Sequence, residues 1–239
     1  MIEHKKDICL LFTCEHAGNM VPHEFAYLFA EHPDVLQTHL GYDIGALELF
    51  QALADYFAAP RFYSTTTRLL VELNRSIDSA NLFSMLTRSL GVAEKQAIMD
   101  AYYFPYRHQV ESQIAQLLAK QKTVLHLSIH SFTPELQGKV RRADIGLLYD
   151  SRYVQEAQTA VLWQRILQRA HPEYVVRRNY PYLGRSDGFT TYLRQKFVGQ
   201  TYMGIEVEVN QKYPRTCPEK WESFKHSIIS SVTSLLKAL

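Results

Sequence analysis

Short apolar runs alternate along the chain with longer stretches in which apolar residues recur every three or four positions. The short runs are typical of strands, and the longer stretches are typical of amphipathic helices. Because the two alternate, the pattern predicts a three-layer α/β sandwich with a mixed, largely parallel central sheet. The predicted strands are Ile8–Cys14, Leu69–Leu73, Val124–Ile129, Ile145–Tyr149, Tyr174–Val176 and Tyr202–Val209. The predicted helices are Ile44–Ala58, Ala93–Ala119, Val154–Ala170, Phe189–Lys196 and Glu219–Leu236.

The composition predicts a single globular domain over residues 1–239, since no linker, repeat or low-complexity stretch divides the chain. A hydrophobic content of 46 % and a charged content of 21 % are ordinary for a soluble protein. The net charge of +2 gives no electrostatic reason to expect a nucleic-acid or membrane partner. Cys9, Cys14 and Cys217 are few and scattered, and the N-terminus is too polar for a signal peptide, so we expect a cytoplasmic protein.

The first predicted strand ends on a cluster of polar groups, Thr13-Cys14-Glu15-His16-Ala17-Gly18-Asn19. Open α/β sheets place their chemistry at the carboxyl ends of strands. His16 is therefore a candidate functional residue, and a histidine satisfied by hydrogen bonds in the core is an equal alternative. Cys14 is a candidate nucleophile activated by His16, although a thiol in an apolar strand favours packing.

Two further segments carry groups that suit a metal or a carboxylate ligand. Asp43 precedes the predicted helix Ile44–Ala58, where spacing alone favours an N-cap, and a metal ligand also fits. Arg68 and Arg75 flank the predicted strand Leu69–Leu73. A guanidinium binds a carboxylate through two hydrogen bonds, and a surface salt bridge is an equal alternative for these arginines.

Two predicted strands carry polar residues at alternate positions. His126, Ser128 and His130 alternate with apolar residues, so they point to one side of their strand. His130 lies at the carboxyl end and is the better ligand candidate, whereas the deeper position of His126 favours a core role. Glu206 and Glu208 share one face of the last predicted strand, where buried carboxylates are costly unless paired, ligated or functional.

The chain contains no short catalytic motif such as His-Glu-x-x-His, a phosphate loop or a Gly-x-Ser-x-Gly elbow. The small basic run at Arg141-Arg142 is interpreted as a solvated loop rather than a binding patch. Two well-placed histidines, several carboxylates and an arginine pair are nevertheless the groups that a mononuclear zinc hydrolase uses. Such a site takes three protein ligands and leaves one position for water.

Six short segments, spread over residues 13 to 211, narrow this interpretation. They are Cys14-Glu15-His16-Ala17-Gly18-Asn19 with Pro22, Asp43-Ile44-Gly45-Ala46, Arg68-Leu69-Leu70-Val71-Glu72-Leu73-Asn74-Arg75, His130-Ser131-Phe132, Ser186-Asp187-Gly188-Phe189-Thr190 and Glu208-Val209-Asn210-Gln211. In this order they resemble the N-formylglutamate amidohydrolase family, which is related to the zinc carboxypeptidases. The resemblance implies a zinc-carboxypeptidase-like (phosphorylase/hydrolase-like) fold.

The resemblance also implies roles for individual residues. One zinc ion would be held by His16, Asp43 and His130, which makes Asp43 a ligand rather than a helix cap, with Glu15 as the rival third ligand. Glu208 corresponds to the carboxylate that activates water. Residues near the substrate are implied as well: Arg68 as a catalytic group that polarises the carbonyl, and Asn74, Arg75, Ser186 and Asp187 as substrate-binding groups.

The reaction that the resemblance implies is hydrolysis of the amide bond of an N-acyl amino acid, such as N-formylglutamate, by metal-activated water. Two departures from the family's pattern concern this small-molecule substrate. Phe189-Thr190-Thr191-Tyr192 stands where relatives often have a histidine, and Asn210-Gln211 stands where several have arginine. The alternatives are a carboxypeptidase-like or other deacylase acting on a different carboxylate-bearing substrate, and a non-catalytic carboxylate-binding protein. The sequence indicates no oligomeric state.

Overall fold

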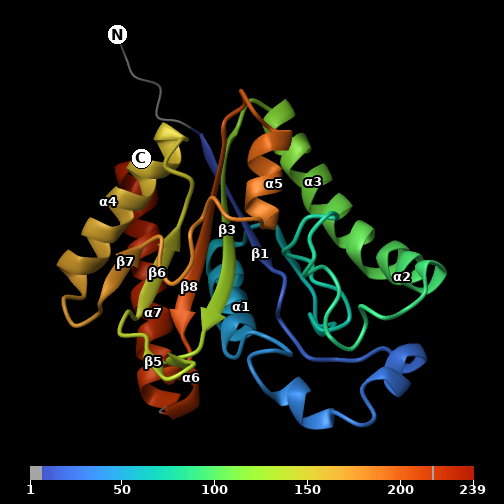
Figure 1. The fold of residues 1–239 in the computed structure, drawn as a ribbon. Coiled ribbons are helices and arrows are strands. Elements are labelled where there is room, and N and C mark those ends of the chain that lie inside the picture. Colours follow the sequence, from blue (N-terminus) through green and yellow to red (C-terminus); the bar gives the residue numbers. More distant parts are fainter. Residues whose placement is uncertain (1–6, 217) are drawn as a thin grey trace.

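Six strands form one mixed sheet through the middle of the molecule (Figure 1). The computed structural model describes residues 7–216 and 218–239. The strand order is β2-β1-β3-β8-β6-β7; the first four strands run parallel, and β6 and β7 run in the opposite direction. The mixed, largely parallel sheet is thereby confirmed. The strands are β1 (Ile8–Cys14), β2 (Arg61–Tyr63), β3 (Thr123–Phe132), β6 (Ile145–Leu148), β7 (Val176–Arg178) and β8 (Tyr202–Asn210).

Helices cover both faces of this sheet and make the three predicted layers (Figure 1). One face packs against α1 (Ala46–Phe57), α4 (Val154–Ala170) and α7 (Pro218–Ala238). The other face packs against α3 (Phe104–Ala119) and α5 (Phe189–Lys196). Burying apolar side chains on both faces stabilises the sheet, and its central strands β3 and β8 are almost wholly buried.

The polar residues of β3 and β8 share one face of the sheet. Leu125, Leu127 and Ile129 of β3 belong to the apolar core beneath α1, α4 and α7. His126 and His130 alternate with them and face the other side, as predicted. Toward the carboxyl ends of the strands this second face is no longer covered by helices and lines a cavity.

Strand register places the candidate groups next to one another. In the parallel pairing of β3 with β8, His130 is opposite Glu208, and Ser128 is opposite Glu206. β1 runs parallel to β3 on its other side. The carboxyl ends of β1, β3 and β8 therefore lie at the same edge of the sheet.

One predicted strand is wrong, and its residues belong instead to an apolar cluster beside the sheet. Leu69–Leu73 is not a strand but a succession of turns. Its apolar side chains are buried in a cluster with loop residues and with Ile98 and Met99 of the helical segment that follows. Its backbone bonds to loops rather than to a strand, since the Glu72 N–H donates to the Leu82 carbonyl at 2.9 Å. Burial of an apolar run does not require a sheet.

The long helix predicted at Ala93–Ala119 is interrupted at its proline, as expected. It consists of α2 (Val92–Ile98), a π-helical turn η3 (Met99–Tyr103) and α3. Pro105 has no backbone N–H to donate, so the hydrogen-bonding pattern changes in the turn before it. The helix predicted from Ile44 begins instead at Ala46, because Gly45 adopts the left-handed conformation with φ of 83°.

Several short elements were not predicted, because six residues or fewer are too short to show a repeating pattern of apolar residues. They are η1 (His23–Leu28), η2 (Pro33–Gln37), β2, β4 (Glu135–Leu136), β5 (Lys139–Val140) and α6 (Lys212–Thr216). Among the described residues, no helix combines the length and apolar character needed to cross a membrane. Cys217 and all but the last residue of the N-terminal segment before β1 lie outside the described residues.

Candidate metal centre

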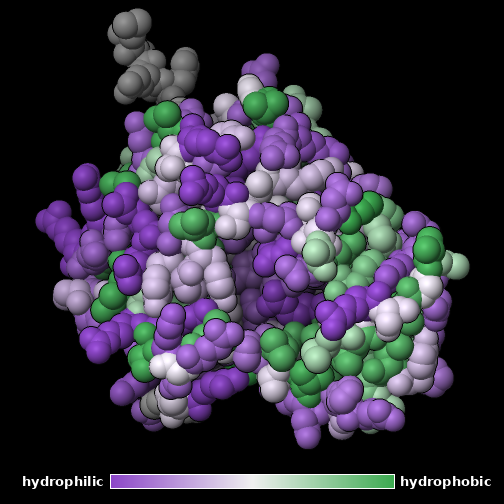
Figure 2. Space-filling view, viewed as in Figure 1, coloured by the Kyte–Doolittle hydropathy of each residue, from purple (hydrophilic) through white to green (hydrophobic). Residues whose placement is uncertain are grey.

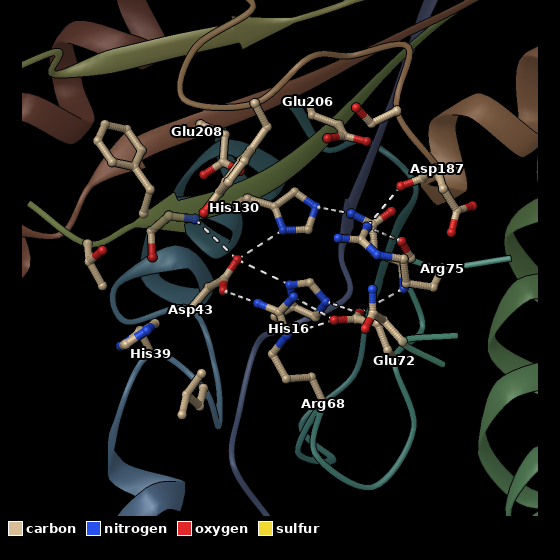
Figure 3. A pocket seen from close by; sticks show the side chains of 18 of the residues that line it. His16, His39, Asp43, Arg68, Glu72, Arg75, His130, Asp187, Glu206 and Glu208 are labelled. Carbon is tan, nitrogen blue, oxygen red and sulfur yellow. Dashed lines mark hydrogen bonds and ion pairs between the residues drawn. The ribbon is translucent and has the colours of Figure 1, made fainter. Parts of the chain in front are cut away.

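Residues from four segments meet at the edge of the sheet where β1, β3 and β8 end (Figure 3). His16 lies two residues beyond β1, Asp43 lies in the loop before α1, and His130 and Glu208 lie near the ends of their strands. They line a cavity of about 540 Å³, here called the site cavity. Figure 2 shows it as a hollow near the middle of this face, with hydrophilic residues at its floor.

Asp43 lies between the two histidines. Its Oδ2 atom is 3.3 Å from Nδ1 of His16 and 2.9 Å from Nδ1 of His130. All three side chains are buried, and one ligand atom from each lies within 4.8 Å of the others. Ligands bound at ~2.1 Å in a tetrahedral site are roughly 3.4 Å apart, so the spacing around Asp43 suits one small ion.

The second nitrogen of each histidine ring is held by a different carboxylate. Nε2 of His16 bonds to Oε1 of Glu72. Nε2 of His130 lies 3.1 Å from Oε2 of Glu15 and 2.9 Å from Oγ of Ser128. Carboxylates in this position fix the tautomer and the orientation of a ligating ring. Both Nδ1 atoms are thereby turned toward Asp43.

Glu15, the rival third ligand, lies behind His130. Its Oε1 atom accepts a hydrogen bond from the Tyr106 hydroxyl at 2.9 Å, and its Oε2 atom accepts one from Ser128 at 2.7 Å. Burial raises the pKa of this carboxyl, but the hydrogen bond and the charge of His130 outweigh burial and hold the pKa below its usual range. The three residues grouped as candidate ligands are His16, Asp43 and His130, without Glu15.

Arg68 binds two carboxylates of the cluster (Figure 3). Its Nη1 atom donates to Oδ1 of Asp43 at 3.1 Å, and its Nε atom donates to Oε2 of Glu72 at 2.8 Å. Burial raises the pKa of Asp43, but the charge of His16 and hydrogen bonds from both histidines hold that pKa well below its usual range. Asp43 is therefore ionised, which is the form that binds a metal.

The N-cap role that spacing alone favours for Asp43 is wrong. Gly45 occupies the N-cap position of α1, and no side chain caps that helix. The Asp43 side chain turns instead to the two histidines, and its Oδ2 atom also accepts the backbone N–H of Ser131 at 3.3 Å.

Glu208 faces the site cavity without a hydrogen-bond partner among the described residues, and its Oε2 atom is fully buried. Burial raises the pKa of this carboxyl to about 7, with the charge of His130 opposing and those of Asp43 and Glu206 adding to the effect. A buried carboxyl without a partner is costly in a folded protein. Its position indicates a group whose partner is a ligand or a substrate.

Glu206 lies two residues earlier on the same face of β8 and differs from Glu208 in its surroundings. It is partly exposed in the site cavity, and its Oε1 atom accepts a hydrogen bond from the Thr190 hydroxyl at 2.6 Å. Glu206 is thus already partnered, whereas Glu208 is not.

Arg75 lines another wall of the site cavity, next to Asp187 (Figure 3). Its Nη1 atom donates to the carbonyl oxygens of Asn74 and Asp187, both at 2.9 Å. Among the described residues no carboxylate forms an ion pair with this guanidinium. Arg75 is therefore held in place by neutral groups, and its charge has no paired carboxylate among the described residues.

The other predicted substrate residues lie beside Arg75. Asn74 is buried, and its Oδ1 atom accepts the backbone N–H of Phe189 at 2.6 Å. The Asp187 carboxylate accepts the backbone N–H of Ser76 at 3.0 Å. Ser186 is exposed and lines the cavity. The structure therefore brings all four together at one wall, with Asn74 and Asp187 bonding to the backbone there.

The model of the N-formylglutamate amidohydrolase family matches residues 8–213. The chain belongs to this family. It is therefore a hydrolase that acts on amide carbon–nitrogen bonds.

Two solved structures are similar to this family member. A gene product from Agrobacterium tumefaciens is 26 % identical with a TM-score of 0.82, and the match covers 98 % of this chain and 92 % of that one. N-formylglutamate amidohydrolase from Ralstonia eutropha JMP134 is 17 % identical with a TM-score of 0.73, and the match covers 98 % and 94 %. Both show the same fold. No curated protein matches the chain.

Glu72 has no predicted role, yet this amidohydrolase fold places it against His16. A signal was present, since Glu72 lies between the apolar residues Val71 and Leu73 in a buried segment. The cost of burying an unpaired carboxylate applies there as it does to Glu208. Ser128 was recognised only by its side of the strand, and its contact with His130 depends on rotamers that the pattern does not encode.

Two neighbours of the candidate metal centre have core roles, as the sequence favours. His126 is fully buried, with its ring nitrogens 2.8 Å from the hydroxyl oxygens of Thr13 and Tyr202. Cys14 is fully buried in the core beneath α1, and burial raises the pKa of its thiol well above the usual range. A thiol in that environment is a poor nucleophile.

Proposed function

We propose that this family member is a zinc-dependent amidohydrolase that cleaves the amide bond of an N-acyl amino acid, with N-formylglutamate as the first candidate substrate. One observation carries the proposal: two histidines converge on an ionised Asp43, and the unpartnered Glu208 carboxyl faces the same cavity. A cytoplasmic location stays a prediction from the cysteine content.

The donor set fits one zinc ion. His16, Asp43 and His130 would hold it through two imidazole nitrogens and a carboxylate oxygen, a combination that leaves a position for water. When bound in such a site, zinc supplies a Lewis acid and lowers the pKa of its water to about 7. Glu72 and Glu15 would keep the two rings in their ligating orientation.

Glu208 is the general base of this proposal. A base works best when its pKa lies near the working pH, and burial raises the pKa of Glu208 to about 7. Positive charge brought into the cluster lowers that pKa and favours the carboxylate, which accepts the proton of water. The oxygen of that water forms a bond to the acyl carbon, and Glu208 then gives the proton to the leaving nitrogen, so that the carbon–nitrogen bond breaks without an external acid.

Arg75 would bind the free carboxylate of the substrate, because its guanidinium has no carboxylate partner among the described residues. Asn74, Ser186 and Asp187 form the wall around it. Holding the substrate at this fixed point would position its amide carbonyl, and positioning of this kind contributes strongly to catalysis.

Arg68 would act on the substrate carbonyl as well as on the cluster. Its side chain is a quarter exposed and lines the site cavity, so its positive charge would act on the carboxylates of the cluster and on a substrate in the cavity. Its hydrogen bonds to Asp43 and Glu72 fix the guanidinium in place, and a fixed positive charge stabilises an oxyanion that develops beside it.

A panel of substrates tests the proposal. Zinc-loaded protein is assayed with N-formyl, N-acetyl and N-succinyl amino acids, and metal content is measured on the same samples. We expect one zinc per chain and amide hydrolysis that a chelator abolishes and a thiol-alkylating reagent does not. Preference for an acyl group other than formyl would favour the alternative deacylase. Ligand binding without any hydrolysis would favour the non-catalytic alternative.

A further inference from the structure

Arg107 of α3 carries a buried positive charge that has no carboxylate partner among the described residues. Its guanidinium carbon lies 4.3 Å from the ring centre of Phe189, 4.5 Å from that of Tyr192 and 4.9 Å from that of Tyr103. Burial lowers the pKa of the guanidinium, but an arginine in a protein keeps its proton. Three aromatic rings therefore contact this cation where a carboxylate would ordinarily pair with it.

The same guanidinium is bonded to the turn that carries Asn74 and Arg75. Its Nη1 atom donates to the carbonyl of Leu73 at 3.0 Å and to the carbonyl of Arg75 at 3.2 Å. The hydroxyl of Tyr103 also donates to the Arg75 carbonyl, at 2.8 Å. Donors from η3 and α3 thus fix the backbone at both ends of residues 73–75.

Arg107 also contacts the element that holds the Arg75 side chain. Nη1 of Arg75 donates to the carbonyl of Asp187, two residues before Phe189 begins α5. The Phe189 ring lies against Arg107, and the Phe189 N–H donates to Oδ1 of Asn74 at 2.6 Å. α3 and α5 pack together on one face of the sheet (Figure 1). One side chain therefore fixes the turn that carries Arg75 relative to the loop that receives its guanidinium.

Packing alone does not explain a charge at the position of Arg107. Moving an ion out of water is costly, and well-packed apolar side chains can replace buried ionic groups without loss of stability. A methionine is long and adaptable enough to fill such a space. What arginine adds is a set of directed N–H donors, and Nη1 of Arg107 is directed at two carbonyls of the substrate wall.

We propose that Arg107 is a positioning residue for the reaction: together with Tyr103, it holds Arg75 where its guanidinium can bind the substrate carboxylate. The inference rests on the proposed function, in which Arg75 is the group that binds this carboxylate. Neither Arg107 nor Tyr103 lines the site cavity. Each therefore acts on the substrate only through the turn at residues 73–75.

The test is a double-mutant cycle with Arg75, assayed on zinc-loaded protein with the panel substrate that wild type hydrolyses fastest. Arg75→Met removes the guanidinium but leaves the carbonyl that Tyr103 and Arg107 bind. We expect Tyr103→Phe to raise KM roughly 2- to 10-fold, since one hydrogen bond is lost, and Arg107→Met to raise it further. The value of kcat should change little, because Glu208 lies on another segment. In the Arg75→Met background, neither substitution should raise KM again.

Tyr102→Phe is the matched control. It removes the hydroxyl of the adjacent tyrosine, which donates to Glu24, and neither of these residues lines the cavity. This variant should keep the wild-type KM. Zinc content and melting temperature are measured for every variant, so that a loss of folding is separated from a loss of position. If Arg107→Met does not fold, the conservative Tyr103→Phe decides the question.

The inference is overturned if Tyr103→Phe keeps the wild-type KM, or if it raises KM by the same factor with and without the Arg75 guanidinium. A binding measurement separates this result from a failure of the proposed function. Dissociation constants for N-formylglutamate, obtained by calorimetry on metal-free protein, should follow the same pattern as KM across the cycle. If wild type hydrolyses no member of the panel, the proposed function fails, and these constants still decide whether Arg107 and Tyr103 act through Arg75.

Discussion

Each histidine ring at the candidate metal centre uses its two nitrogens differently. Nδ1 of His16 and of His130 faces Asp43, and Nε2 faces a carboxylate, Glu72 or Glu15. Asp43 approaches Nδ1 of both rings, whereas Glu72 and Glu15 each approach Nε2 of one ring. Replacing Asp43 removes a proposed metal ligand. Replacing Glu15 leaves the three proposed ligands in place and removes only a contact that orients the His130 ring.

Replacing Asp43 and Glu15 separately should therefore give different results. We expect Asp43→Ala to lose stoichiometric zinc, and Glu15→Gln to retain zinc with an affinity roughly 10- to 100-fold lower. Zinc affinity is measured by competition with a chelator of known strength, and Glu135→Gln, on the exposed β4, is the control. Full zinc occupancy in Asp43→Ala would remove Asp43 from the ligand set.

Glu208 and Glu206 provide a matched pair for testing the general base. Glu208→Gln keeps the shape of the side chain but cannot accept a proton, so we expect kcat to fall by roughly 10²- to 10⁴-fold. Zinc content and product binding should stay at wild-type levels. Glu206→Gln, in the neighbouring position with a hydrogen bond from Thr190, should lose far less. Equal losses in the two variants would mean that they share the role.

At the scale of the elements, a buried ion pair between α4 and α5 holds the loop that leads to Ser186, at the wall of the site cavity. Nε of Arg194 in α5 lies 2.9 Å from both carboxylate oxygens of Glu156 in α4. The same guanidinium donates to the carbonyls of Gly184 at 2.7 Å and Gly204 at 2.8 Å. Two helices, β8 and the loop leading to Ser186 are thereby joined through one side chain.

Breaking this pair should be costly, because it leaves a buried carboxylate without its counter-charge. We expect Arg194→Met to lower the free energy of unfolding by about 3–5 kcal/mol, as measured by urea denaturation. Arg61→Met breaks an exposed pair with Asp55 and should cost no more than about 1 kcal/mol. A comparable cost for the two variants would contradict the special role given to the buried pair.

Elements long enough to show a clear apolar run or a repeating apolar pattern could be predicted from the sequence. The bounds of β1, α4 and α5 agree with the prediction residue for residue. Leu69–Leu73 could not be assigned correctly, because an apolar run reports burial and not the partner that provides it. β2 has only three residues, and two of them are exposed, so it left no apolar pattern at all.

At the scale of the whole molecule, parallel strands explain why distant residues meet. The position at a strand end is enough to predict His16 and His130 as functional residues, whereas the role of Glu208 comes from the family resemblance. Asp43 entered the set only through family resemblance, since spacing alone favoured a helix cap. The contacts of Glu72 follow from how its loop folds back beside the sheet, which no local sequence pattern encodes. The single-domain organisation stays a prediction.

The burial of the His126 ring should make the stability of the whole molecule depend on pH. Burial lowers the pKa of this ring to about 4, whereas an exposed histidine in the unfolded chain titrates near 6.5. Between about pH 6.5 and 4 the unfolded chain therefore binds a proton that the folded protein excludes. Stability should fall as the pH drops through this window, by up to about 1.4 kcal/mol for each pH unit from this residue.

Comparison with a variant isolates this contribution from those of the other histidines. His126→Gln can still bond to Thr13 and Tyr202 but cannot titrate, so its free energy of unfolding should fall less steeply than that of wild type between pH 6.5 and 4. Metal-free protein is used, because proton release by a bound metal would add its own pH dependence. His226→Gln, on the exposed face of α7, should keep the wild-type slope. Parallel curves for wild type and His126→Gln would show that the ring takes up its proton without opening the core.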